Sequence, residues 1–309
     1  MADPIVSILL VTWKRVDLLE KCLKSIAAAK PDVPFEIIIV NNGGSRTAAR
    51  VDAIASGARV VHSRVNLGLP GGLRLARSIA RGKYLATLQD DVAVEAGWLD
   101  RLVARMDADP WVGIVGSSVE LPGGYRICGL YLLGGLTWLH PTADPGPVPV
   151  DLCTSASMLL RARAWDDAGG PSPELFPLGY VDFDLCIRVA CCGWIVEILS
   201  TSLVRHEWHQ STSPALRAYT VERNANPVRK WHAAWLAERP QQATLEEMRS
   251  RLIARAKAIR AKPPPAGKDP QPLTPADLAR LERIARWGAL RIRLGKLKSI
   301  LTRRAPAKS

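Results

Sequence analysis

The chain has 309 residues, of which 48% are hydrophobic, so it can form two domains or one large domain with a sizeable core. Its net charge of +13 lies entirely in the C-terminal part. Residues 251–309 hold 16 Lys and Arg against 3 Asp and Glu, whereas residues 1–250 hold 26 of each sign. A body without excess positive charge argues against a nucleic-acid enzyme with a basic cleft, and no apolar stretch is long enough to span a bilayer.

The cysteines and the N-terminus indicate the compartment. The N-terminus has no basic region before its first apolar run, so we interpret that run as a strand and not as a signal peptide. The six cysteines form no CxxC pair and no zinc-like spacing, so we expect buried free thiols in a reducing cytosol. They are Cys22, Cys128, Cys153, Cys186, Cys191 and Cys192.

Residues 5–118 alternate between strand-like and helix-like patterns. Continuous apolar runs predict buried strands, and a period of 3.6 residues predicts amphipathic helices between them. The expected strands are 5–11, 35–40, 58–62, 84–88 and 112–115. We expect the first helix to begin after Asp17 as its N-cap, and three further helices to cover 46–56, 73–80 and 98–106. This order predicts an α/β fold, with a Rossmann-like, mostly parallel sheet flanked by helices on both faces.

The rest of the chain divides into three stretches. Residues 119–150 are rich in Gly and Pro, and we expect loops there. Residues 151–212 form a mixed segment, with a strand ending at Leu160, helices at 161–168 and 182–192, and a strand at 194–199 leading to His206. From residue 214 the pattern is helical, interrupted by a Pro-rich linker near 262–275. The predicted units are 1–118 and 119–213, two halves of one domain, and a helical, basic C-terminal extension at 214–309.

Three polar clusters follow strands of the predicted sheet: residues 12–15, 41–42 and 89–91. Because ligands of such sheets bind outside the carboxyl ends of the strands, we expect these clusters to converge. Asp90 and Asp91 are adjacent carboxylates, and hard oxygen ligands on a loop suit Mg²⁺ or Mn²⁺ shared with substrate phosphates. The alternative is a solvated turn or a helix start, where Asp is also favoured.

Six segments in order resemble motifs of the inverting glycosyltransferases of family 2, which have the GT-A fold. The resemblance covers about residues 5–212 and extends to rhamnosyl- and galactofuranosyltransferases. Each motif alone is weak, but six in the right order are a strong signal. The segments are 6–15, 38–45, 66–72, 88–92, 179–188 and 204–212. The resemblance makes 1–118 the nucleotide-sugar-binding half and 119–213 the acceptor-binding and catalytic half.

The resemblance places a divalent metal, Mn²⁺ or Mg²⁺, on Asp91, the last acid of a DxD-type motif. It implies that His206 completes the metal shell, with His209 as an alternative ligand. Asp90 would face the ribose or the metal. Gln89 stands where the family often has Asp, which weakens the local charge.

The resemblance also implies the donor site. Thr12, Trp13 and Arg15 would frame the nucleotide, with Trp13 stacking on the base or, alternatively, only packing at a strand end. Asn41 replaces the Asp that usually contacts the base. Asn66 and Gly68 belong to an Asn-x-Gly segment, in which glycines allow close approach to phosphate or sugar or simply form a tight loop before a helix.

Inversion at the anomeric carbon needs one base to deprotonate the acceptor hydroxyl, and Asp182 is the candidate. Its alternative role is a helix N-cap. Val181 stands where the family has Glu. Asp184 and Arg188 are four residues apart on one helix, which favours a structural ion pair.

The resemblance implies transfer of a hexosyl or deoxyhexosyl group from a UDP or dTDP sugar to the hydroxyl of a sugar, lipid-linked or small-molecule acceptor. One alternative is a nucleotidyltransferase, which usually needs a Gly-rich loop after the first strand, whereas residues 12–15 contain no glycine. Another is a catalytically weak sugar- or nucleotide-binding module, which the departures at Gln89, Asn41 and Val181 leave open.

The last helix carries an apolar stripe among basic residues, and we expect Thr274 to cap it. Such a helix can lie on an anionic membrane surface, or it can pack its stripe on the catalytic body. Both readings stay open, so the expected location is cytoplasmic, with peripheral membrane contact as one alternative. The stripe consists of Leu278, Leu281, Ile284, Ala285, Leu290 and Ile292.

Overall fold

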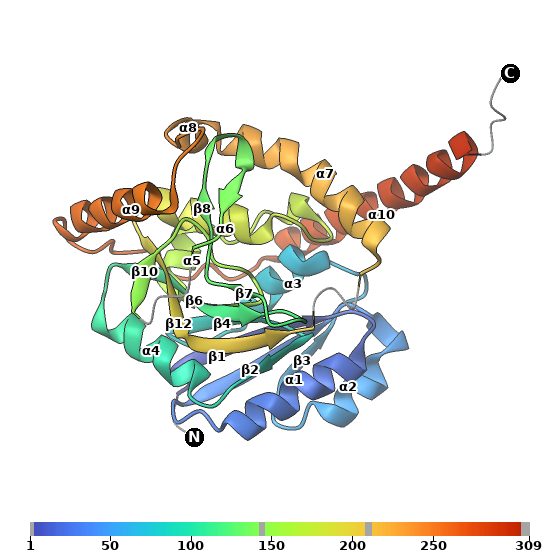
Figure 1. Cartoon of the computed structure of the whole chain (residues 1–309). Helices are drawn as coiled ribbons and strands as arrows, with labels where there is room; N and C mark the ends of the chain where they lie inside the picture. The colour runs from blue at the N-terminus through green and yellow to red at the C-terminus, as the bar shows by residue number, and fades with distance from the viewer. Residues whose placement is uncertain (1–2, 142–145, 208–211, 304–309) are drawn as a thin grey trace, which may run out of the picture.

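A ten-stranded sheet organises the described part of the chain, which in this computed structural model comprises residues 3–141, 146–207 and 212–303 (Figure 1). Its strand order is β10-β12-β6-β11-β4-β1-β2-β3, with β5 beside β12 and β7 beside β6. The longer strands are β1 (Val6–Thr12), β2 (Phe35–Asn41), β3 (Arg59–His62), β4 (Tyr84–Gln89), β6 (Val112–Glu120), β11 (Ser157–Arg161) and β12 (Ile195–His206).

The sheet is mostly parallel, as the sequence predicts. β1 is parallel to β2 and β4, and β12 is parallel to β6, whereas β11 runs antiparallel between β4 and β6. The expectation of loops over 119–150 is wrong in part, because the end of β6 and several short strands lie there. The short strands of the fold are β5 (Val92–Val94), β7 (Arg126–Ile127), β8 (Tyr131–Leu132), β9 (Trp138–Leu139) and β10 (Pro147–Pro149).

Helices cover both faces of this sheet, which explains why its strands are continuous apolar runs. On one side lie α1 (Val16–Ala29), α2 (Ala48–Ile54) and α4 (Trp98–Ala108) (Figure 1). On the other side lie α3 (Gly68–Arg77), α5 (Ala162–Ala168) and α6 (Val181–Cys191). The predicted layered α/β architecture is therefore confirmed.

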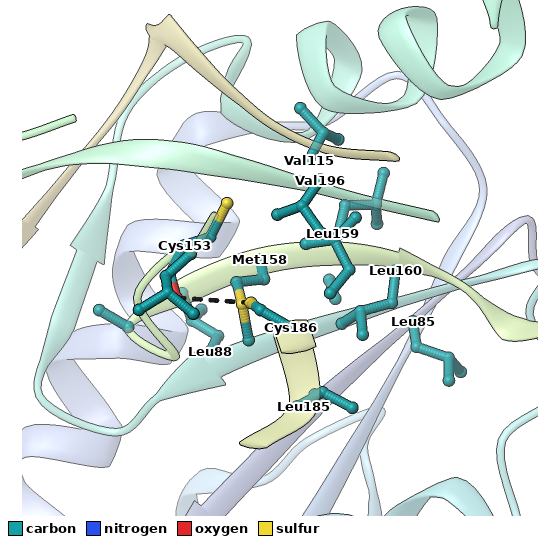
Figure 2. Packing of buried hydrophobic residues seen from close by; sticks show 14 of the residues in the cluster. Leu85, Leu88, Val115, Cys153, Met158, Leu159, Leu160, Leu185, Cys186 and Val196 are labelled. Carbon is teal, nitrogen blue, oxygen red and sulfur yellow. Dashed lines mark hydrogen bonds between the residues drawn. The ribbon is translucent and has the colours of Figure 1, made fainter. Parts of the chain in front are cut away.

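The core between α6 and the sheet contains buried leucines and two buried thiols (Figure 2). Cys186 of α6 points its Sγ toward the backbone oxygen of Cys153 at 3.9 Å, and burial raises the pKa of both thiols. The expectation of buried cysteines is wrong for Cys191 and Cys192, which are exposed. They lie at the C-terminal end of α6, beyond the face that the helix buries.

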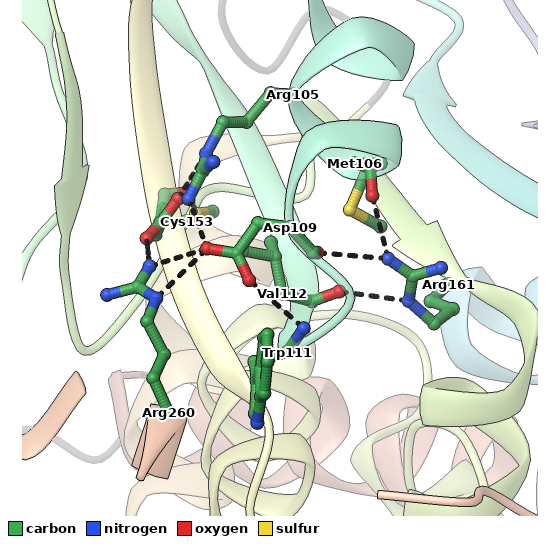
Figure 3. Close-up of polar contacts among 9 residues, drawn as sticks. Arg105, Met106, Asp109, Trp111, Val112, Cys153, Arg161 and Arg260 are labelled. Atoms are coloured by element: carbon green, nitrogen blue, oxygen red, sulfur yellow. Dashed lines mark hydrogen bonds and ion pairs between the residues drawn. The ribbon is translucent and has the colours of Figure 1, made fainter. Parts of the chain in front are cut away.

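The C-terminal extension is helical, as expected, and buries side chains of each of its helices against the body. It consists of α7 (Pro214–Trp231), α8 (Ala233–Ala237), α9 (Leu245–Arg260) and α10 (Pro275–Arg303). At the end of α9, Arg260 Nη2 lies 2.7 Å from both Asp109 Oδ2 and Glu197 Oε1, and Arg105 pairs with the same two acids (Figure 3). Burial alone would raise the pKa of Asp109, but hydrogen bonds from Arg260, the Trp111 amide and Arg105 bring it below its usual value.

The last helix, α10, begins as predicted and divides its apolar stripe between two environments. The Asp277 amide donates to Thr274 Oγ1 at 3.2 Å, so Thr274 caps the helix. Leu281 and Ala285 are buried against the body, whereas Leu278 and Leu290 are exposed. The C-terminal end of α10 projects away from the body (Figure 1). Within the described residues, no helix combines the length and apolarity needed to cross a membrane.

Candidate active site

A cavity of about 750 Å³ lies at the carboxyl ends of β1 and β4, where the sequence predicts a site. The loop that precedes α6, the end of β12 and residues of α7 and α10 complete its walls. Arg15 and Asn41 do not line it, although both are predicted donor residues. The predicted site residues that do line it are Thr12, Trp13, Asn66, Gly68, Gln89, Asp90, Asp91, Asp182 and His206.

Asp91 and His206 meet because of the short strand β5. This strand begins one residue after Asp91 and pairs antiparallel with the end of β12, so that Val92 lies opposite His206. His206 Nε2 lies 3.0 Å from Asp91 Oδ1, and each side chain is only 6% exposed. The sequence did not predict β5. The structure brings Asp91 and His206 into direct contact, and their role as ligands of one metal stays a prediction.

The two side chains fit a divalent cation. Two ligands at right angles on an octahedral ion, with bonds of about 2.1 Å, lie about 3 Å apart, which matches the distance between Asp91 Oδ1 and His206 Nε2. Carboxylate and imidazole are ligand types that Mn²⁺ accepts. Among the described residues, no group of three or more His, Cys, Asp and Glu is arranged to hold a metal, and His209 lies outside them. Waters or substrate phosphates would supply the other ligands.

Asp90 has an unsatisfied acceptor beside this pair. Within the part of the chain that the structure describes, its Oδ2 is buried and has no hydrogen-bond partner. Burial raises the pKa of Asp90 to about 7, and the neighbouring charge of Asp91 acts in the same direction. A cation here would relieve both the desolvation and the repulsion, which is a second observation in favour of a cation site.

Asp182 is the second residue of α6 and faces the same cavity. The backbone N–H groups of Ser155 and Phe183 donate to its Oδ2 and Oδ1 at 3.3 Å and 3.1 Å. These bonds fix the orientation of the carboxylate. Burial raises the pKa of Asp182, which makes it a stronger base than a solvated aspartate. Its alternative role as N-cap is wrong, because Tyr180 occupies that position.

The Asn-x-Gly segment forms a tight loop over the cavity. Asn66 Oδ1 accepts a 2.8 Å hydrogen bond from the Gly68 amide, and Asn42 bonds both the Leu67 amide and the Gly68 oxygen. Gly68 has φ +69°, and an added Cβ would lie 2.8 Å from Pro177 Cα. Glycine is therefore required at this position for both its backbone conformation and its close contact.

The helix after this loop starts earlier than the sequence predicts. α3 begins at Gly68 and not at Leu73, so Gly71 and Gly72 lie inside a helix. Gly72 packs under β1, where a Cβ would lie 2.7 Å from Val11 Cγ1. The glycines bring α3 close to the sheet, and this packing offsets their low helix propensity.

Asn41 and Arg15 have local structural partners. Asn41 Oδ1 accepts from the Gly43 amide and from Thr47 Oγ1 at 2.9 Å and 2.7 Å, so its amide holds the loop after β2. Its neighbour Asn42 lines the cavity instead. Arg15 pairs with Asp17 at 2.6 Å and is itself the N-cap of α1, so the expected Asp17 cap is wrong. The cavity lining gives no support to donor binding by Asn41 or Arg15.

Other predicted positions combine local contacts with access to the cavity. Gln89 Nε2 donates to Ser155 Oγ at 3.0 Å, so the motif's first residue holds the loop that also orients Asp182. Trp13 lies half-buried at the cavity, with Lys14 Nζ 3.9 Å from its ring centre.

The predicted ion pair of Asp184 and Arg188 is present at 2.9 Å.

Sequence reasoning missed the residues of α7 and α10 that line the cavity. They include Arg217 from α7 and Arg286, Ile292 and Arg293 from α10. In the sequence, the only signal for these residues was the amphipathic pattern of the last helix. Such a pattern shows that a helix has an apolar face, but it does not show what that face contacts.

Comparisons with known proteins identify a matching family model and similar folds. Residues 7–141 match the family model described as Glycosyl transferase family 2. The chain is 26% identical over 210 residues to the uncharacterized protein y4gI of Sinorhizobium fredii. The aligned region covers 62% of this chain but only 23% of that protein. The chain therefore spans less than a quarter of this curated relative.

Two solved structures show a similar fold. GalNAc-T7, solved with UDP, GalNAc and Mn²⁺, has a TM-score of 0.61 at 14% identity, covering 84% of this chain and 56% of that one. The mannosyltransferase PcManGT from Pyrobaculum calidifontis, in complex with GDP-Man and Mn²⁺, has a TM-score of 0.50 at 15% identity, covering 85% and 82%. At such identities the likeness shows the GT-A-type fold alone.

Proposed function

We propose that this chain, whose residues 7–141 form a glycosyl transferase family 2 domain, transfers a sugar from a UDP or dTDP donor to an acceptor hydroxyl. The proposed reaction is inverting and assisted by a divalent metal. The observation that carries the proposal is one cavity containing a half-buried base, Asp182, and the buried pair Asp91 and His206. The nucleotides and Mn²⁺ bound in the two solved structures support a nucleotide-sugar donor.

The proposed division of labour follows the local electrostatics. Asp91 and His206 would hold Mn²⁺ or Mg²⁺, and the ion would neutralise charge on a departing diphosphate. Asp182 accepts the proton of the attacking hydroxyl, and its raised pKa favours this transfer. The Ser155 and Phe183 amides keep its carboxylate pointed at the cavity. Inversion requires one base and one displacement, so no second carboxylate is needed as a nucleophile.

Asp182→Asn and Asp91→Ala test the two halves of this proposal. We expect Asp182→Asn to lower transfer by roughly 10²- to 10⁴-fold, the usual contribution of a general base, while UDP binding persists. We expect Asp91→Ala to abolish the effect of Mn²⁺ on UDP binding, measured by isothermal titration with and without EDTA. Asp52→Asn, whose carboxyl is 57% exposed, is the control. Full transfer activity in both site variants would refute the proposal.

We also propose peripheral membrane contact through the outward face of α10. Trp287, Leu290 and Leu294 are exposed and recur at three- and four-residue spacing, so they lie on one face of the helix. The surrounding stretch, residues 251–309, carries the whole excess positive charge. An apolar face with basic neighbours is the composition that binds an anionic lipid surface.

A further inference from the structure

The part of the cavity formed by α7, α10 and the loop before α6 is largely apolar, in contrast to the acidic end at Asp91. Its wall lies largely outside the residues that match the family model. A nucleoside diphosphate and a metal do not need such a surface, so an apolar part of another ligand fits it better. The apolar lining residues are Phe176, Leu178, Leu216, Val221, Ala289 and Ile292.

α10 is packed closely enough to act as a fixed wall. Gly288 lies against Phe176, and an added Cβ would overlap the Phe176 ring. Leu281 and Ala285 are buried in the same cluster as Phe176. Because Phe176 also lines the cavity, the position of α10 is coupled directly to the shape of the site.

Three arginines line this same cavity: Arg217 of α7, and Arg286 and Arg293 of α10. Among the described residues, no carboxylate pairs with Arg217 or Arg293, and the nearest partner of Arg286 is Glu282 at 3.4 Å. Guanidinium groups bind phosphate and carboxylate through charge-assisted hydrogen bonds. The wall therefore offers positive charge beside an apolar surface.

We propose that α7 and α10 complete the acceptor site, and that the acceptor carries an anionic group, a phosphate or a carboxylate, joined to an apolar segment. The identification of this ligand as the acceptor rests on the proposed function, in which Asp182, in the same cavity, is the base. Binding of such an amphiphile does not depend on transfer, so it can be measured separately.

The test is isothermal titration of the full chain with octyl phosphate, inorganic phosphate and octanol. We expect octyl phosphate to bind at least tenfold more tightly than either fragment, because only it uses both parts of the wall. We expect Arg217→Gln and Arg293→Gln each to weaken octyl phosphate binding about tenfold, within the range of a charge-assisted hydrogen bond. Arg291→Gln, on α10 but outside the cavity lining, should leave it unchanged.

Each outcome bears on the proposal. Octyl phosphate binding no tighter than inorganic phosphate, measured on the unaltered chain, would overturn the apolar part. Unchanged binding in both arginine variants, with folding verified by circular dichroism, would overturn the anionic part. Weaker binding of UDP with Mn²⁺ in the same variants would assign the arginines to the donor and overturn the acceptor site. Failure of UDP to bind the unaltered chain, with octyl phosphate still bound, would refute only the proposed function.

Discussion

At the scale of single residues, Asp182 experiences two opposing influences. Burial disfavours its charge, whereas the Ser155 and Phe183 amides favour it, and burial has the larger effect, so the pKa is raised. Between the ordinary and the raised pKa, the folded chain retains a proton that the unfolded chain has released. The free energy of unfolding contributed by Asp182 therefore falls as pH rises through that window.

Asp182→Asn removes this titration. We expect the melting temperature of the variant to fall less than that of the unaltered chain as pH rises from about 4, the ordinary carboxyl pKa, toward 7. Thermal unfolding followed by circular dichroism over this range measures the difference. Asp52→Asn, at an exposed carboxyl, should keep the slope of the unaltered chain. Identical slopes for all three proteins would show that the pKa of Asp182 is not raised in the folded chain.

Gly68 can be compared with another glycine of positive φ. Both Gly68 and Gly57 have left-handed backbones, but a Cβ at Gly68 would collide with Pro177 while one at Gly57 meets nothing within 4 Å. We expect Gly57→Ala to cost about 1 kcal/mol of unfolding free energy and Gly68→Ala about 2–4 kcal/mol. Urea denaturation measures both costs. UDP titration should show weaker binding for Gly68→Ala alone. Equal losses of unfolding free energy in the two variants would contradict the packing argument.

Single residues also show what the sequence can and cannot predict. Asp90 and Asp91 were found because they end an apolar strand, and their cluster lies at the cavity. Asn41 is the last residue of β2 and Asn42 directly follows it, yet only Asn42 lines the cavity. Adjacent side chains on an extended backbone point in opposite directions, so a one-residue difference decides which of two like residues faces a ligand. Periodicity does not resolve that difference.

At the scale of elements, the positions of the strands along the chain were predictable where apolar runs are long. β5 has three residues, which is too few for a periodic signal, yet it brings β12 and His206 to Asp91. The start of α3 was also missed, because Gly71 and Gly72 are poor helix formers in isolation. Contact with β1 outweighs that propensity, and such tertiary contacts are not visible in the local sequence.

Arg260 contributes to the attachment of α9, which also buries Met248, Leu252 and Ala256 in the core. Its removal leaves Asp109 and Glu197, both buried, with Arg105 as their remaining cation. Loss of a fully buried partner costs about 3–5 kcal/mol, but the Arg260 side chain is 35% exposed, so we expect Arg260→Ala to cost about 1–2 kcal/mol. Urea denaturation measures this cost. Lys257→Ala, at an exposed position on the same helix, should leave the free energy of unfolding nearly unchanged. An equal loss in both variants would mean that the charge network does not anchor α9.

At the scale of the whole molecule, positive charge and exposed apolar residues occur together at one end of the chain. We expect the protein to sediment with vesicles that contain anionic lipid and not with purely zwitterionic vesicles, and to be released by salt. Leu290→Asp should reduce this binding severalfold. Ile253→Asp, at an exposed apolar position of α9, is the matched control. Equal loss in both variants, or no preference for anionic lipid, would contradict membrane contact by α10.

The contribution of α10 to the cavity lies beyond what a single sequence predicts. Thr12 and Arg293 line the same cavity from opposite ends of the chain. The stripe of α10 showed that this helix has an apolar face, and the structure shows that part of it packs on Leu67 and Phe176 while Leu290 stays exposed. Such long-range packing depends on complementary shape, which local patterns do not encode.

The seating of α10 on Phe176 through Gly288 has an evolutionary consequence. The position of the helix is set by this contact and by Leu281 and Ala285, whereas Ala289 and Arg293 lie farther along it and line the cavity. On the proposed acceptor site, substitutions at those last two positions are expected to change acceptor preference without moving the helix or altering Asp91, Asp182 and His206. Related chains that differ at these positions are then expected to form different products by the same proposed reaction.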